Sequence, residues 1–280
     1  MVIINVQRGG PSTGLPTKTE QSDLVQALYG RNGEAPIPLI AAATPGDCFY
    51  AAYEASRIAL KYMTPVVLLT DGYLANGSEP WKIPDVDSME SIDVQFVDGV
   101  KEGEEFMPYK RDEDTLSRPW AIPGVPGLEH RVGGLEKAEN TGHVSYDPDN
   151  HQRMVELRQE KVDRIQNDIA KTEVFGEENG DVLILSWGGT YGSCRSAVET
   201  LHDQEKSVSH VHVRWISPLP KDLGEIIIKF KNVLIPEINM GQLIKIIRSE
   251  YLVDAKGLNQ VNGKPISASR IVEKVNEMVG

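Results

Sequence analysis

The 280-residue sequence predicts an α/β protein of two domains, each built on a mainly parallel sheet. Strand-like apolar runs alternate with helix-like periodicity over residues 1–77 and again over 181–280. Between these regions lie a proline- and glycine-rich stretch at 78–146 and a charged, helix-like stretch at 147–180. Strands that alternate with helices form parallel sheets covered by helices, so we expect two such domains, separated by an irregular excursion and a connecting helix.

The first domain opens on the apolar run VIINVQ at 2–7, which predicts a buried, central parallel strand. A doubly wound domain rarely opens on a central strand. We therefore expect the chain to be a fragment, or another chain to supply the missing part. A helix is expected next, at 22–30.

Two further strands, PLIAAA and PVVLLTD, flank a second helix in this domain. The helix should begin at the tetrapeptide Thr44-Pro45-Gly46-Asp47, with Thr44 as N-cap, Pro45 at the first helical position and Asp47 at the third. Apolar residues spaced three and four apart continue the helix through FYAAYEASRIALKY.

The excursion at 78–146 has few periodic apolar runs, and a segment this irregular is usually functional or part of an interface. Asp147-Pro148 then start a long helix that we expect to run over 149–172 and connect the domains. In the second domain, strands are expected at DVLILSW, VSHVHVRWI and NVLIPE, and helices at SCRSAVETLHDQ, LPKDLGEIIIKF, NMGQLIKIIRSEYL and SASRIVEKVNEMV.

Composition excludes several classes of function. A net charge of −12 argues against nucleic acid as a partner, because phosphate backbones require a basic face. There is no apolar run long enough to span a membrane and no basic leader typical of a signal peptide, so a cytoplasmic protein is expected. Cys48 and Cys194 are far apart, which argues against a disulfide framework, a cysteine zinc site or an iron–sulfur cluster carried by this chain alone.

The stretch RGGPSTG, directly after the first strand, is the leading candidate site. Arg8 lies just beyond the carboxyl end of a predicted parallel strand, the edge at which open α/β sheets bind ligands. Its planar guanidinium suits a carboxylate, and Gly9 and Gly10 let backbone approach a ligand. Thr13 and Thr17 add short donors. The alternative is a glycine–proline turn with a structural arginine.

For three other motifs, we favour a structural role over a ligand-binding one. GGTYG at 188–192 stands between a strand and a helix, as phosphate loops do, but it lacks the GxGxxG spacing and a Walker lysine, so a tight turn is favoured. Glu237 and Asn239 lie at a strand end and are expected to cap and pack rather than bind ligand. His210 and His212 share one strand face and could hold a metal, although a solvated or helix-covered edge is favoured.

Asp71-Gly72, at the end of PVVLLTD, could form either a strand-end turn or a ligand contact. No catalytic triad is discernible, because neither a GxSxG elbow nor a Cys–His signature occurs.

The run QRGGPSTGLPTKTEQSDL resembles the 2-oxoacid:ferredoxin oxidoreductases, and in particular their alpha subunit of the 2-oxoglutarate type. The resemblance continues through QALYGRNGEAPIP, LLTDGYLANGSEPW, GLEHRVGGLE, TGHVSYDPDNH and VLIPEINMGQL, so it covers essentially the whole chain in order. A transketolase-like or acetolactate-like thiamine enzyme is disfavoured by the RGGPSTGLPTKTEQ run.

The resemblance implies that residues 1–77 are part of a pyrimidine-binding domain for thiamine diphosphate and that 181–280 form a transketolase C-terminal-like domain. It implies that Arg8 and Thr17 are the catalytic pair: Arg8 binds the 2-oxoacid carboxylate and Thr17 lines the pocket. Gly9, Gly10 and Thr13 complete the expected substrate-binding set. Which residues contact the cofactor is left unassigned.

The implied reaction converts a 2-oxoacid, CoA and oxidised ferredoxin into acyl-CoA, CO₂ and reduced ferredoxin. The family's YPITP-like motif and its activating glutamate, which precede this strand, do not occur here, and neither does a GDG…N motif for Mg²⁺ and diphosphate. Thiamine diphosphate, Mg²⁺ and the iron–sulfur cluster are therefore expected mostly on a beta subunit, the implied partner along with ferredoxin. The alternative is a non-catalytic fragment that only docks to the beta subunit.

Overall fold

In the computed structural model, which describes residues 1–280, the first sheet has four strands in the order β1-β3-β2-β9. The strands β1, β3 and β2 are parallel, and β9 runs antiparallel to β2. The elements of this half are β1 (Val2–Gln7), α1 (Leu24–Tyr29), β2 (Leu39–Ala41), α2 (Asp47–Lys61), β3 (Val66–Asp71) and α3 (Gly72–Asn76). The predicted strands and helices are thus present.

The position of β1 differs from the prediction. It pairs with β3 alone and so forms an edge of the sheet, and the side chains of Ile3, Ile4 and Val6 are 42%, 59% and 49% exposed. The prediction of a buried central strand was therefore wrong. An apolar run predicts a strand, but it does not show how many other strands will pair with it. The strand β3, in contrast, lies between β1 and β2 and is buried at every position.

The start of α2 is held by the predicted residues. The Thr44 hydroxyl accepts a hydrogen bond from the Asp47 amide at 3.1 Å, and the Asp47 carboxylate accepts one from the Ala43 amide at 2.8 Å. The first bond satisfies an amide that the helix start leaves free, and the second ties the segment before the helix to its first residue. Regular helix begins at Asp47, later than Pro45 was expected to start it.

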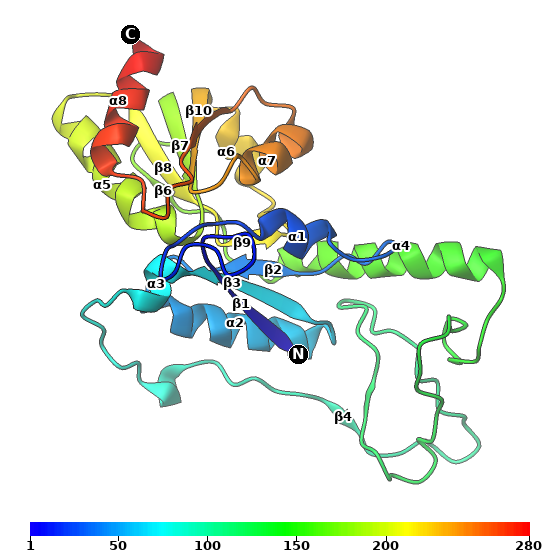
Figure 1. Cartoon of the computed structure of the whole chain (residues 1–280). Coiled ribbons are helices and arrows are strands. Elements are labelled where there is room, and N and C mark those ends of the chain that lie inside the picture. Colours follow the sequence, from blue (N-terminus) through cyan, green and yellow to red (C-terminus); the bar gives the residue numbers. More distant parts are fainter.

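The stretch 78–146 is irregular, as predicted. It contains a short 3₁₀ turn, η1 (Val86–Ser88), and the two-residue strands β4 (Phe96–Val97) and β5 (Trp120–Ala121). Figure 1 shows this excursion passing beneath α2 and turning back to α4. The Trp120 indole N–H donates to the carbonyl of Leu60 in α2 at 3.1 Å, which attaches the excursion to the first domain.

The connecting helix α4 (Pro148–Arg164) begins where predicted, since the Asp147 carboxylate accepts bonds from the Asp149 and Asn150 amides at 2.8 and 3.1 Å. It continues only as the 3₁₀ turn η2 (Ile165–Asn167), so it ends before residue 172, where the prediction placed its end. In Figure 1, α4 projects well beyond both sheets before it returns to them.

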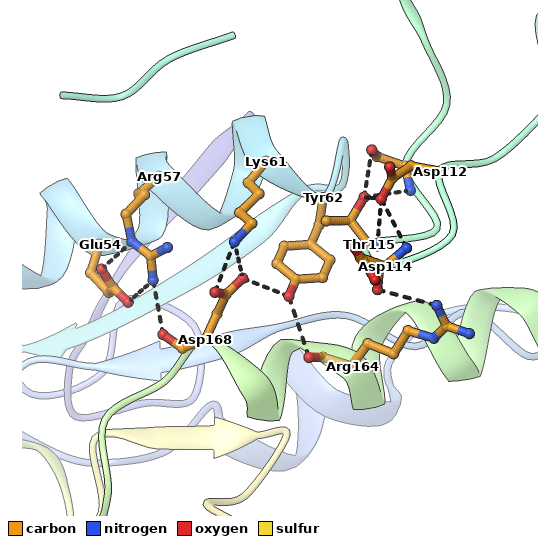
Figure 2. Close-up of polar contacts among 10 residues, drawn as sticks. Glu54, Arg57, Lys61, Tyr62, Asp112, Asp114, Thr115, Arg164 and Asp168 are labelled. Carbon is orange, nitrogen blue, oxygen red and sulfur yellow. Dashed lines mark hydrogen bonds and ion pairs between the residues drawn. The ribbon is translucent and has the colours of Figure 1, made fainter. Parts of the chain in front are cut away.

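A polar network joins the end of α4 to α2, as Figure 2 shows. The Tyr62 hydroxyl donates to the Asp168 carboxylate at 2.6 Å, and Lys61 forms an ion pair with the same carboxylate at 2.7 Å. Burial raises the pKa of Asp168, but the bonds from Lys61 and Tyr62 outweigh burial and leave this pKa below its ordinary value. The Arg57 guanidinium adds a bond to the Asp168 carbonyl at 3.1 Å.

The second sheet has five strands in the order β11-β10-β7-β8-β6, all parallel to their neighbours except β6. Its helices and strands are β6 (Val174–Phe175), β7 (Gly180–Ser186), α5 (Tyr191–Asp203), β8 (Val208–His212), α6 (Leu223–Ile227), β10 (Phe230–Glu237), α7 (Leu243–Tyr251), β11 (Lys256–Asn259) and α8 (Ala268–Val279). The short strands β6 and β11 were not predicted. No helix of the chain combines the length and the apolar character needed to cross a membrane.

The predicted strand VSHVHVRWI is split between the two sheets. Its first part is β8, whereas β9 (Trp215–Ser217) leaves the second sheet and pairs antiparallel with β2 of the first. At the crossing, the Arg214 guanidinium forms an ion pair with the Asp47 carboxylate at 2.7 Å, and its carbonyl accepts a bond from the Ala41 amide at 2.8 Å. The two sheets therefore share this one segment of chain.

Candidate functional site

The loop after β1 is closed on itself by backbone bonds. The Gly9 amide donates to the carbonyl of Lys18, and the Leu15 amide donates to the carbonyl of Gly9, both at 3.0 Å. Gly14 has a φ of +55°, and a Cβ atom added there would lie 1.8 Å from the Gly9 carbonyl oxygen. Because no side chain fits in that space, the loop requires glycine at this position.

Arg8 is exposed at the carboxyl end of β1, as predicted. Its guanidinium donates to two carbonyls of its own loop, those of Ser12 at 3.0 Å and of Thr13. Gly10, Thr13 and Thr17 are also exposed, whereas Gly9 is buried beneath them. The predicted residues thus belong to one closed loop. Its arginine can exchange neutral carbonyl partners for a carboxylate, which forms stronger, charge-assisted bonds.

A buried carboxylate, Asp71, supports this loop from below. It is completely buried at the end of β3 and accepts bonds from the Thr19 hydroxyl at 2.9 Å and the Gly189 amide at 3.0 Å. It also caps α3 by accepting from the amides of Tyr73 and Leu74 at 2.8 and 3.2 Å. Of the two roles considered for Asp71-Gly72, the structure therefore shows the strand-end turn.

Gln21 connects the loop to the second domain and was not singled out from the sequence. Its side chain is completely buried, donates to the Trp187 carbonyl at 2.6 Å and accepts from the Ile238 amide at 3.1 Å. The Asn239 amide group donates to the Gln21 carbonyl at 2.8 Å. All three partners follow the ends of β7 and β10, at the carboxyl edge of the second sheet, which is the usual ligand-binding edge. That edge is filled here by the first domain.

Glu237 and Asn239 have the capping and packing roles that were favoured. The Glu237 carboxylate accepts bonds from the Leu243 and Ile244 amides at the start of α7, at 2.7 and 3.2 Å, and from the Trp187 indole at 3.2 Å. Burial raises its pKa, although these hydrogen bonds oppose the shift. The carboxylate therefore joins the start of α7 to the end of β7 within the second half of the chain.

The GGTYG motif forms the 3₁₀ turn η3 (Gly188–Thr190) and the first turn of α5. Gly188, Gly189 and Thr190 are all buried, and a Cβ atom at Gly189 would lie 2.4 Å from the Asp71 carboxylate. The amide that a phosphate would need is thus bound to Asp71. The favoured reading of a tight structural turn is confirmed.

His210 and His212 lie on the same face of β8, with the Ser186 hydroxyl between them at 2.6 and 2.8 Å from their ring nitrogens. The prediction was a solvated or helix-covered edge: β8 is not an edge strand, because it lies between β7 and β6, but Tyr191 of α5 does cover both histidines, with ring centres 5.8 and 5.1 Å away. Burial lowers the pKa of His210 to about 4 and that of His212 well below its ordinary value, so both rings are neutral at pH 7. No group of three or more His, Cys, Asp or Glu side chains converges in the chain to hold a metal, and both cysteines are free.

Comparison with known proteins agrees with this architecture. Residues 1–147 match the family model described as pyruvate flavodoxin/ferredoxin oxidoreductase, thiamine diphosphate-binding. The chain is 49% identical over 272 residues to 2-oxoglutarate oxidoreductase subunit KorA of Mycobacterium tuberculosis, which covers 97% of this chain and 41% of that protein. The chain therefore spans less than half the length of this relative.

Solved structures extend the match. A 2-oxoglutarate:ferredoxin oxidoreductase from Magnetococcus marinus, solved with 2-oxoglutarate, coenzyme A and succinyl-CoA bound, superposes with a TM-score of 0.91 at 33% identity. The match covers 100% of this chain and 48% of that one. A split-gene transketolase, at 14% identity and a TM-score of 0.50, over 99% of this chain and 66% of its own, shares the fold alone. The chain belongs to the pyruvate flavodoxin/ferredoxin oxidoreductase family, and it is of the alpha-subunit type.

Proposed function

We propose that this chain is the alpha-subunit portion of a 2-oxoglutarate:ferredoxin oxidoreductase. In the complex it would oxidatively decarboxylate the 2-oxoacid in the presence of CoA, releasing acyl-CoA and CO₂ and reducing ferredoxin. The names of the Mycobacterium tuberculosis and Magnetococcus marinus relatives support 2-oxoglutarate as the substrate. The observation that carries the proposal is the exposed Arg8 guanidinium at the carboxyl end of β1, on a loop fixed from beneath by Asp71.

In this proposal Arg8 binds the substrate carboxylate. Its two N–H groups leave the Ser12 and Thr13 carbonyls and form a two-pronged contact with the incoming carboxylate. Thr17 lines the same pocket, while Gly9, Gly10 and Thr13 allow the substrate to approach the backbone. The closed loop keeps the arginine in position, so substrate binding would require little reorganisation.

The donors on this loop fit a substrate carboxylate better than a metal-bound diphosphate. Arg8, Thr13 and Thr17 supply N–H and O–H donors, and no carboxylate cluster stands beside them to hold Mg²⁺. Thiamine diphosphate, when bound, would supply the electron sink for decarboxylation. We infer that a beta subunit holds its diphosphate and Mg²⁺, and that the iron–sulfur cluster passing electrons to ferredoxin also lies outside this chain.

The same proposal gives the domain roles. Residues 1–77 would be part of the pyrimidine-binding domain, 78–146 an excursion contacting other subunits, 147–180 the connector, and 181–280 a transketolase C-terminal-like domain. Two free cysteines suit a reducing compartment, so we infer a cytoplasmic location.

Substitution of Arg8 in the assembled enzyme tests the proposal. Arg8→Ala should raise KM for 2-oxoglutarate at least tenfold, because one charge-assisted pair is worth more than 1.4 kcal/mol at a substrate site. Arg8→Lys should recover only part of this, since an ammonium lacks the planar fork. The matched control is Arg248→Ala on α7, which removes an exposed arginine paired with Asp254. An unchanged KM in Arg8→Ala would exclude the role.

The assignment as a whole is tested with the chain as bait in its source cells. The recovered complex is assayed for reduction of a viologen dye that depends on both a 2-oxoacid and CoA, using 2-oxoglutarate, pyruvate and a branched-chain 2-oxoacid. Activity with a recovered beta subunit supports the oxidoreductase and names its substrate. Recovery of that subunit without activity would instead support the alternative of a docking fragment.

A further inference from the structure

Three half-buried cations without an acidic partner meet where the excursion packs against α4. They are Arg111, Arg118 and Lys161, and none of them takes part in an ion pair of the chain. Other partly buried arginines do have carboxylate partners: Arg57 with Glu54, Arg164 with Glu160 and Arg214 with Asp47. The unpaired group is thus an exception within an acidic protein of net charge −12.

The backbone of the excursion brings the two arginines together. The Asp112 amide donates to the Ser117 carbonyl at 2.9 Å, which closes a loop whose flanking residues are Arg111 and Arg118. Both guanidinium groups then face the ring of Tyr109, with their central carbons 6.0 and 4.6 Å from its centre. The two cations therefore lie around one aromatic ring.

Packing fixes this loop against α4, and the only bonds of the Arg111 guanidinium are long ones to neutral acceptors, the Tyr109 carbonyl at 3.4 Å and the Met154 sulfur of α4 at 3.5 Å. Leu116 is buried against Met154 and Leu157 of α4. On the other side, the Arg164 guanidinium donates to the carbonyls of Glu113 and Asp114, the latter at 3.1 Å. Figure 2 shows Arg164 beside Asp114. Lys161 lies one turn beyond Leu157 and so on the same face of α4 as this residue, which packs against Leu116 of the loop.

The electrostatic consequence is repulsion among the three groups. Burial, followed by the charges of Arg111 and Arg118, lowers the pKa of Lys161 to about 8. Burial likewise lowers the pKa of Arg111. Glu139 is the carboxylate that acts on Arg111, but it is partly exposed and contacts Arg153 at 3.8 Å. The cluster thus retains an excess of positive charge that a bound anion would neutralise.

We infer that Arg111, Arg118 and Lys161 form a binding site for a phosphate group. Two arginines offer planar pairs of donors that match phosphate oxygens, and the lysine adds a compact charge. A phosphate dianion matches three cations better than a single carboxylate does. The site is separate from the Arg8 loop: it lies near the end of α4, where the Tyr62 hydroxyl at the end of α2 donates to the Arg164 carbonyl at 3.3 Å, whereas the Arg8 loop lies beyond the carboxyl end of β1.

The test is thermal unfolding of the full chain at pH 7 in buffers of matched ionic strength that contain chloride, acetate, inorganic phosphate or AMP. Because the ionic strength is the same in every buffer, general screening of charges by salt cannot explain a difference in Tm between them. Inorganic phosphate at tenfold its Kd should raise the Tm by about 2–4 °C over chloride. If AMP raises it further at equal concentration, the natural ligand is a phosphomonoester rather than free phosphate.

Two variants assign the effect to the cluster. Lys161→Met and Arg118→Gln should each weaken phosphate binding at least tenfold and so reduce the shift to about a third or less, whereas Lys274→Met, which removes a lysine paired with Glu277 on α8, should keep it. Three results would overturn the inference: no shift in the unmodified chain, an equal shift with acetate, or an undiminished shift in both cluster variants.

Discussion

Replacing Lys161 with methionine should stabilise the protein, which is the opposite of what removal of a half-buried side chain usually does. The pKa of this lysine is lowered from 10.5 to about 8 by burial and by Arg111 and Arg118. The folded state therefore binds its proton more weakly than the unfolded state does. At pH 7 the lysine is charged in both states. The free energy that corresponds to its full pKa difference therefore destabilises the folded state. Methionine keeps most of the aliphatic length without the charge.

The size of the effect follows from the pKa difference. A shift from 10.5 to about 8 corresponds to ~3 kcal/mol at 1.36 kcal/mol per pKa unit. Solvent reaches part of the side chain, and the thioether packs less well than a native contact, so we expect a net gain of about 1–2 kcal/mol. As pH rises above 8 the folded state loses the proton first. The penalty in the unmodified protein should therefore shrink, to about a quarter of its size by pH 10.

Thermal unfolding of both chains in chloride buffer at pH 7 and pH 10 measures this. Lys161→Met should melt about 2–6 °C higher at pH 7, and the difference should largely disappear at pH 10. Because both chains are compared at each pH, titration of other groups cancels to first order. A variant that melts lower at pH 7, or a difference that does not change with pH, would show that the three cations do not repel one another as described.

Three further outcomes are expected. Asp71→Asn should cost about 1–3 kcal/mol in chemical unfolding, because its amide group would face an N–H donor in place of an oxygen. Gly14→Ala should reduce kcat/KM of the assembled enzyme more than tenfold while the Tm of the chain changes little, since the clash is confined to the exposed loop. Stability should fall as pH drops from 6.5 toward 4, because the unfolded chain protonates His210 and His212 before the folded chain does; replacing both with asparagine should flatten the Tm–pH curve in that range.

Sequence periodicity predicted the elements that depend on local patterns. The strand β3 and the helix α2 were correctly predicted because a fully apolar run and a capping tetrapeptide carry their own signal. The position of β1 at the sheet edge depends on which strands pair with it, and no local pattern encodes that. The departure of β9 into the first sheet likewise arises from a pairing between residues about 175 apart.

The residues of the candidate site also fall into those that the sequence could predict and those that it could not. Arg8 and its loop were identified because glycine, proline and arginine directly after a strand predict a loop at the ligand-binding edge of the sheet, with a side chain that can bind a carboxylate. Gln21 was missed because an uncharged glutamine in a polar run predicts no particular role. Its role is seen only from its bonds to Trp187 and Ile238 in the folded chain. The cluster of Arg111, Arg118 and Lys161 was also missed, since its members come from an irregular segment and a helix that only the fold brings together.

These contacts give the second domain a direct part in shaping the proposed site. Gln21 inserts between Trp187 and Ile238, at the edge where a sheet of this type usually binds its own ligand. Gly189 donates to Asp71, which in turn holds Thr19 at the base of the Arg8 loop. The loop is therefore tied at two points to the second sheet. Any displacement of that sheet would therefore move the loop as well. The edge at which the second sheet would usually bind a ligand instead holds the Arg8 loop of the first domain in place.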